Sequence, residues 1–143
     1  MTIEDNAKAY AHYYEVIAPD TLDRLGDMLA TDVVFIDPFN RIVGKDQMVD
    51  VFRQMFETMD NPKFDVLDLA LSERAAYLKW RMTGTVKAAP KMPFDIVGMS
   101  EVTFDAEGKV IMHHDHWDSG SQLLRHLPYI GWITKRIMRL FAH

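Results

Sequence analysis

The chain has 143 residues, the size of one domain with a substantial core. Its 48% hydrophobic and 26% charged residues are ordinary for a soluble globular protein, and the absence of cysteine excludes disulfides and thiolate metal sites. The net charge of −5 argues against a general nucleic-acid binder. Because no segment approaches about 18 consecutive apolar residues and residues 1–20 lack a signal-peptide core, we expect a cytoplasmic protein.

The N-terminal segment has the pattern of two helices. Thr2 is suited to cap the first helix, with Asp5 in the position that a capping box uses. One face of this helix carries Ile3, Ala7, Tyr10, Tyr14 and Ile17. Tyr13 lies on the flank of that face, and Pro19 ends the helix. A second helix, capped at Asp20 or Thr21, is expected to bury Leu22, Leu25, Met28 and Leu29.

A strand and a third helix follow. Val33 to Asp37 has the pattern of a strand, and Pro38 begins a polar turn that ends at Gly44. The spacing predicts a helix over residues 46–59, which Asn61-Pro62 stops. Its buried stripe is expected to contain Met48, Val51, Phe52, Met55, Phe56 and Met59.

From residue 63 the pattern changes to that of strands. Strands are predicted at 63–72, 76–87, 94–104 and 109–118, with a connection at 88–93 and a hairpin loop at 105–108. Helices that precede a set of short-looped strands indicate the α+β class, with the helices packed on an antiparallel sheet. No repeat or linker divides the chain, so we expect a single domain over residues 1–143.

The strand before Pro38 ends in a carboxylate. Val33, Phe35 and Asp37 share one strand face because side chains alternate. Placed between Phe35, Pro38 and Phe39, the Asp37 carboxylate would be poorly hydrated, which would make it a better base. The alternative is that Asp37 ends an edge strand and faces water.

The last strand contains the second group of chemically active residues. Ile111, His113, Asp115 and Trp117 would share one face, and if Ile111 and Trp117 mark the inner face, His113 and Asp115 lie inside. A carboxylate beside an imidazole orients the ring, which suits a proton relay. The alternative is a buried pair in which the two side chains only satisfy each other.

Two possible metal sites lie on this strand. His113 and Asp115 have the spacing of part of a facial iron triad, and His114 and His116 could chelate a metal on the outer face. Neither is favoured, because exposed histidine pairs are commonly only solvated, and we therefore expect no metal and no organic cofactor.

The order of these elements resembles the nuclear transport factor 2-like superfamily, which includes ketosteroid isomerases, scytalone dehydratase, limonene-epoxide hydrolase and SnoaL-like cyclases. The resemblance covers about residues 4–118 and rests on the strand FIDPF, the turn to Gly44, the hairpin FDAEGKV and Trp117. It implies a curved, cone-like antiparallel sheet wrapped by three N-terminal helices, and a homodimer formed through the outer face of the sheet.

The ketosteroid isomerase pattern implies roles for several residues. Asp37 stands where those enzymes have their general base, and Tyr13 has the spacing of their oxyanion-hole tyrosine. The second oxyanion donor, an acid in the isomerases, falls on Ser100 here. His113 and Asp115 stand where the isomerases have apolar residues, which moves the resemblance toward the dehydratases and SnoaL-like cyclases.

This resemblance implies a cofactor-independent isomerase, dehydratase or cyclase for a hydrophobic carbonyl or hydroxyl compound. The residues expected to line its pocket are Phe35, Met55, Phe56, Trp80, Met82, Ile96 and Trp117. A non-catalytic carrier of a small ligand and a protein-interaction module of the same fold remain alternatives.

The C-terminal segment departs from the isomerase pattern. Residues 119–143 contain Arg125, Lys135, Arg136 and Arg139 and no acid, a net charge of +4, so the rest of the chain carries −9. The pattern predicts a short helix at 119–126 and a second at 132–141. We expect the second helix to pack on the body or over the mouth of the cone. Contact with an anionic membrane surface is the alternative.

Overall fold

The computed structural model describes residues 1–90 and 94–142, so the predicted connection at 88–93 lies partly outside the described residues. The helical elements are α1 (Ile3–Glu15), η1 (Pro19–Thr21), α2 (Leu22–Met28), α3 (Lys45–Thr58), α4 (Ser119–Gln122), η2 (Leu124–His126) and α5 (Ile130–Arg139). The strands are β1 (Leu29–Ile36), β2 (Arg41–Val43), β3 (Met59–Leu71), β4 (Ala76–Val86), β5 (Phe94–Phe104) and β6 (Val110–His116).

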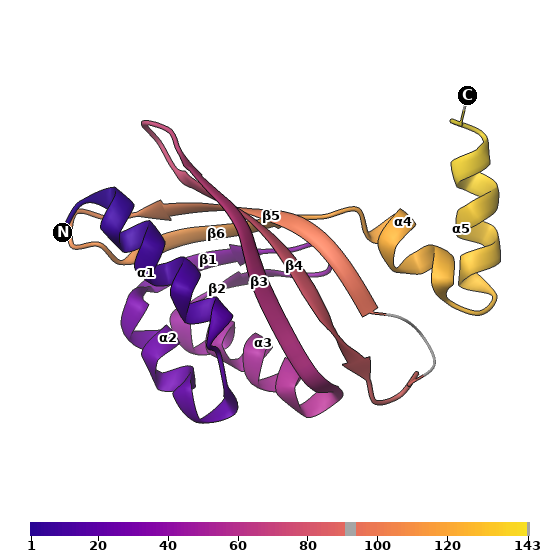
Figure 1. Cartoon of the computed structure of the whole chain (residues 1–143), viewed down its shortest axis with the longest axis horizontal. Helices are drawn as coiled ribbons and strands as arrows, with labels where there is room; N and C mark the ends of the chain where they lie inside the picture. Colours follow the sequence, from indigo (N-terminus) through magenta and orange to yellow (C-terminus); the bar gives the residue numbers. More distant parts are fainter. Residues whose placement is uncertain (91–93, 143) are drawn as a thin grey trace.

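One curved sheet organises the molecule. Its strand order is β2-β1-β6-β5-β4-β3, and every neighbouring pair is antiparallel except β1 and β6, which run parallel. Helices α1, α2 and α3 cover one face of the sheet, with α1 against β3 and β4 and α3 against β1 and β3 (Figure 1). The predicted α+β architecture is thus confirmed.

The core lies between these helices and the sheet. Its largest fully buried side chains include Tyr10 from α1, Phe35 from β1, Met48 from α3 and Ile96 from β5. The predicted capping box is present at the start of α1, since the amide of Asp5 donates to Thr2 Oγ1 and the amide of Thr2 donates to the Asp5 carboxylate. Helix α1 therefore starts where the sequence predicts.

The region around Pro62 differs from the prediction. Helix α3 ends at Thr58, and Asn61-Pro62 lies inside β3, not at the end of the helix. Asn61 has a φ of 50°, and the register against β4 shifts between Asp60 and Lys63. Proline has no N–H for the ladder, so the strand accommodates it at a bulge. The predicted polar turn before Gly44 also contains a short strand, β2.

A second irregularity decides which side chains of β6 face the core. The register between β5 and β6 shifts where Phe104 pairs with Val110 and Thr103 pairs with Met112. As a result Val110 is buried and Ile111, predicted to face inward, is 40% exposed. His113 is only 3% exposed, so its predicted inward position is correct although Ile111 is not its companion.

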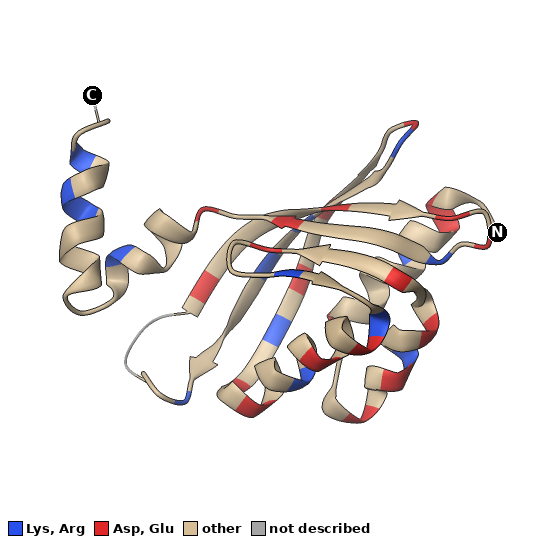
Figure 2. Ribbon diagram, turned by 180° about the vertical axis from the view of Figure 1, so that it is seen from behind, with Lys and Arg blue, Asp and Glu red and all other residues tan. Residues whose placement is uncertain are grey.

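The C-terminal segment extends away from the cone. It leaves β6, forms α4 and η2, and ends in α5, which contacts η2 and stands off the body in the views of Figures 1 and 2. The expectation that this helix packs on the body or over the cone mouth is therefore wrong in this structure. No helix in the described part of the chain is long and apolar enough to cross a membrane.

Close packing between β4 and β5 depends on a glycine. Gly98 pairs with Trp80 across the two strands, and the indole ring folds over it. A Cβ on Gly98 would lie 2.6 Å from two ring carbons of Trp80, closer than any packed side chain allows.

We expect Gly98→Ala to lower the free energy of unfolding by about 1–3 kcal/mol, because the added methyl must displace the Trp80 ring. Urea unfolding followed by far-UV circular dichroism measures the change. Gly26→Ala is the control, since its Cβ would meet only Val49 Cγ2 at 3.9 Å and alanine favours helix α2 by up to about 1 kcal/mol. Equal stability of the two variants would contradict this account of Gly98.

Candidate functional site

A cavity of about 370 Å³ lies between the helices and the inner face of the sheet. Its wall is mostly apolar and contains six of the seven predicted lining residues: Phe35, Met55, Trp80, Met82, Ile96 and Trp117. Phe56 is not among the described lining residues and instead packs, partly buried, against the core. The cone is hollow in this structure and has room for a small hydrophobic molecule.

The polar part of the wall is a continuous chain of hydrogen bonds. Starting on α1, Tyr14 Oη lies 2.9 Å from Tyr10 Oη, which lies 2.7 Å from His113 Nδ1. His113 Nε2 lies 2.7 Å from Asp115 Oδ1. From the other side, Trp80 Nε1 donates to Ser100 Oγ at 2.8 Å, and Ser100 Oγ donates to the same Asp115 Oδ1 at 2.5 Å.

The donors in this chain all point toward Asp115. The Trp80 indole can only donate, so the hydroxyl proton of Ser100 is left to donate to the carboxylate. With Asp115 ionised, His113 donates from Nε2 and accepts at Nδ1 from the Tyr10 hydroxyl. Burial raises the pKa of Tyr10, and burial likewise raises the pKa of Tyr14 well above its usual value, so both hydroxyls stay protonated as donors.

Asp115 has one oxygen left for the cavity. Its Oδ1 accepts from His113 and Ser100, while no described residue bonds to its Oδ2. Within the described residues no buried side-chain oxygen or nitrogen lacks a partner, and Asp115 lines the cavity. Oδ2 is therefore an accessible carboxylate oxygen on a residue that lines a mostly apolar cavity.

Local structure explains these positions. Ser100 pairs directly with Asp115 across β5 and β6, and Trp80 lies two residues along β4 from the partner of Ser100, Leu78. Tyr10 and Tyr14 are one turn apart on α1, so both rings face the sheet. The bulge in β6 turns His113 toward them.

Asp37 also lines the cavity, but from the turn between β1 and β2. It is half-buried, and its Oδ1 accepts from the backbone N–H groups of Phe39 and Asn40 and from Asn40 Nδ2. The parallel register of Phe35 with His113 and Ile36 with His114, continued by one residue, sets Asp37 opposite Asp115. The structure therefore brings Asp37, Ser100, His113 and Asp115 to one cavity.

Tyr13 is not brought to that cavity. Its hydroxyl donates to the backbone carbonyl of Thr21 at 3.0 Å, and Tyr14 takes the place at the described cavity wall. The family spacing had indicated Tyr13 and not Tyr14. The helical face of α1 carried the signal, because it placed Tyr10 and Tyr14 inward and Tyr13 on the flank.

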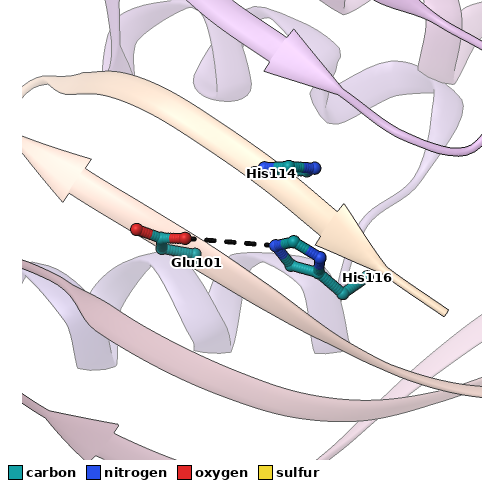
Figure 3. A group of neighbouring side chains, drawn as sticks. All are labelled: Glu101, His114 and His116. Carbon is teal, nitrogen blue, oxygen red and sulfur yellow. Dashed lines mark ion pairs between the residues drawn. The ribbon is translucent and has the colours of Figure 1, made fainter.

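The outer face of the sheet carries a separate polar cluster. Glu101, His114 and His116 place one possible metal-binding atom each within 4.8 Å of one another, and His116 Nε2 lies 4.0 Å from Glu101 Oε2 (Figure 3). Donors around one tetrahedral zinc ion are about 3.4 Å apart. A metal would therefore require these side chains to move, and the cluster faces away from the cavity.

The buried tyrosines predict how stability depends on pH. Because burial raises the pKa of Tyr10 and Tyr14 above the ordinary value of 10.0, the folded state holds these protons more tightly than the unfolded chain. Their contribution is complete below pH 10 and is lost as the pH rises further, by about 1.4 kcal/mol per pH unit for each tyrosine.

We therefore expect the double variant Tyr10→Phe/Tyr14→Phe to lose less stability between pH 9 and pH 11 than the unmodified chain, measured by urea unfolding. Tyr129→Phe is the control because Tyr129 is exposed, and its pH dependence should match that of the unmodified chain. An unchanged slope in the double variant would contradict the burial of these hydroxyls.

Solved structures of similar shape support the fold. A protein with a ketosteroid isomerase-like fold from Catenulispora acidiphila, in complex with trimethylamine, is 18% identical over 92% of this chain and 98% of that chain, with a TM-score of 0.72. An LEH-like epoxide hydrolase of M. tuberculosis is 13% identical, with coverages of 94% and 97% and a TM-score of 0.70.

A steroid delta-isomerase from Pseudomonas aeruginosa is 19% identical, with coverages of 95% and 93% and a TM-score of 0.61. These identities establish the fold alone. The curated proteins contain no match to the sequence. The family model of the SnoaL-like domain matches residues 10–113, which run from within α1 to His113 on β6 and include most of the residues that line the cavity. The predicted resemblance is confirmed, and the chain belongs to the SnoaL-like domain family.

Proposed function

We propose that the protein is a cofactor-independent enzyme that transfers a proton on a hydrophobic carbonyl or hydroxyl compound, of the isomerase, dehydratase or cyclase type. The observation that carries this proposal is the Asp115 carboxylate, which has two donors on Oδ1 and an accessible Oδ2 in an apolar cavity. A positioned carboxylate with a free oxygen is suited to act as a general base.

In this proposal Asp115 is the general base, the role that the family resemblance implied for Asp37. Donors of its own turn occupy both carboxylate oxygens of Asp37, three on Oδ1 and the Asn40 amide on Oδ2, which makes Asp37 part of the rim structure. Asp115 is instead fixed by His113 and Ser100 from neighbouring positions of the sheet. Groups on rigid strands hold a catalytic geometry better than groups on turns.

The proton transfer is balanced without a co-reactant. Asp115 Oδ2 takes a proton from the carbon next to the substrate carbonyl, and the electron pair of the broken C–H bond moves onto the carbonyl oxygen. The Tyr14 hydroxyl, which donates to Tyr10 in this structure, turns its one proton to that oxygen and donates a hydrogen bond there as the charge develops. In a β,γ-unsaturated ketone the resulting dienolate takes the proton back at the γ-carbon as the electron pair returns from the oxygen, which completes an isomerisation and restores the carboxylate. His113, with Tyr10 behind it, holds Asp115 in position throughout.

Steroid isomerisation in particular is not favoured. Ser100, which stands in place of the acidic oxyanion donor, already donates to Asp115 and accepts from Trp80. We therefore expect weak or no activity on 5-androstene-3,17-dione. The isomerase and epoxide hydrolase among the solved structures show that this fold hosts more than one reaction.

The two alternatives lead to different observations. A protein-interaction module needs no cavity, and the 370 Å³ cavity disfavours it. A ligand carrier would bind a hydrophobic compound without turnover. Binding and proton exchange measured on the same compounds separate a carrier from the proposed enzyme.

We expect the protein to accelerate exchange of the α-protons of at least one compound in a panel of hydrophobic terpenoid and polycyclic ketones in D₂O, followed by proton NMR. Asp115→Asn should lower that rate by about 10² or more while thermal-shift binding persists, because the amide keeps the shape and loses the base. Asp23→Asn, an exposed carboxylate on α2, is the matched control and should leave the rate unchanged.

Three results would contradict the assignment. If Asp37→Asn abolishes exchange and Asp115→Asn does not, the base is Asp37. If ligands bind and no exchange occurs, the protein is a carrier. If no compound of the panel binds, the cavity does not take hydrophobic ketones.

The neighbouring tyrosines on α1 provide a second test. Tyr14→Phe should lower the exchange rate by about 10², because it removes the donor to the developing oxyanion. Tyr13→Phe removes a hydroxyl that bonds to the Thr21 carbonyl and should leave the rate unchanged. Circular dichroism establishes that both variants fold. A larger loss in Tyr13→Phe would restore the role that the family spacing implied.

A further inference from the structure

The segment after β6 begins with a fixed connection to the sheet. Asp118 caps α4 by accepting from the Ser121 amide. Gln122 then binds the backbone of Val97 on both sides, accepting from its N–H at 2.7 Å and donating to its carbonyl at 2.9 Å. The chain turns at Tyr129, with a φ of 61°, and α5 projects from this base. Helix α4 is thus fixed to β5, whereas α5 contacts η2 and stands outside the core.

Helix α5 exposes a broad apolar face. At 100° per residue its large apolar side chains other than Trp132 fall within less than half of the helix circumference. These side chains are Ile130, Ile133, Ile137, Met138, Leu140 and Phe141, with the last two from the end of the helix. Leu140 and Phe141 are each 77% exposed. The segment η2 contacts the helix at Gly131, and the apolar side chains of this face stay exposed in the described structure.

The opposite side of α5 is basic. Lys135, Arg136 and Arg139 lie there together with Trp132, and the Arg136 guanidinium stands 5.6 Å above the Trp132 ring. Among the described residues no carboxylate lies within 4.0 Å of these three bases. Figure 2 shows these basic positions on a helix held apart from the acidic body. Their charge is therefore not neutralised within the chain.

We propose that α5 is a membrane-surface helix that binds anionic phospholipid bilayers, with its apolar face at the acyl boundary and its basic residues at the headgroups. A sharply amphipathic helix with Lys and Arg on one face and Ile, Leu and Phe on the other is the composition that lies in a bilayer interface. The helix lies in the interface without crossing the bilayer, since its ten residues are about 15 Å long.

Lipid suits this face better than a second copy of the chain. A standard protein dimer buries about 800 Å² per partner. One face of a helix about 15 Å long and 10 Å wide supplies far less than that. The complete absence of acids in residues 119–143 fits a polyanionic surface and offers no partner for the bases of another α5.

The test is co-sedimentation of the full chain with vesicles of phosphatidylcholine alone and of equal parts phosphatidylcholine and phosphatidylglycerol. We expect binding to the anionic vesicles, weakened as salt rises, and little binding to the neutral ones. Replacing Lys135, Arg136 and Arg139 by Gln should weaken binding by about 100-fold, about fivefold for each base.

Two further variants separate this proposal from general charge effects. Lys8→Gln/Arg74→Gln/Lys79→Gln removes the same charge from exposed positions of the body and should leave vesicle binding nearly unchanged. Ile133→Ser/Ile137→Ser should weaken binding by about tenfold or more, because it interrupts the apolar face. Circular dichroism and sedimentation velocity establish fold and mass for each variant.

Three outcomes would overturn the proposal. The first is absence of binding to anionic vesicles at low salt. The second is an equal loss in the body control, which would indicate non-specific charge attraction. The third is a change of mass in the Ile133→Ser/Ile137→Ser variant without vesicle binding by the unmodified chain, which would show that α5 contacts a second copy.

Discussion

The carboxylate of Asp115 is the constraint on which the interior of this protein depends. A charge at an apolar wall is costly unless donors compensate it, and His113 and Ser100 supply two donors to one oxygen. Each of these donors is itself fixed by a further group, Tyr10 on one side and Trp80 on the other. Loss of one member would leave its neighbours without a partner, so the chain acts as a unit.

The fold meets this requirement with local departures from regular structure. Because the register shifts between Thr103 and Phe104, His113 faces inward and Ile111 does not. In a regular strand both side chains would lie on the same face. Gly98 has no side chain, so the Trp80 indole can lie across it and reach Ser100. A β-bulge and a glycine inside strands are unfavourable for the sheet alone and are explained here by the site that they position.

These departures also mark how far the sequence could predict the molecule. Hydrophobic periodicity predicts the helices, the long strands and the α+β class, and the motif run predicts the family, because these features are repeated along many residues. A bulge depends on one residue of register, and for that reason alternation placed His113 correctly and Ile111 wrongly. The family spacing indicated Tyr13, whereas Tyr14 lines the cavity. A spacing taken from other proteins does not report which face of the helix this chain buries. The donors around Asp37 lie in its own turn and carry no periodic signal.

The position of α5 has another physical cause. Its amphipathic pattern fits equally well with packing on a protein and with lying on a membrane, since both bury an apolar face. In this structure Gln122 binds the backbone of Val97, and the chain after it runs away from α1, α2 and α3. None of the residues in the Asp115 chain belongs to this segment, so the proposed catalysis and the proposed membrane contact depend on separate parts of the protein. The two parts meet at Trp117, which lines the cavity and directly precedes Asp118, the cap of α4. Helix α5 therefore belongs to a segment that leaves the body next to a cavity-lining side chain.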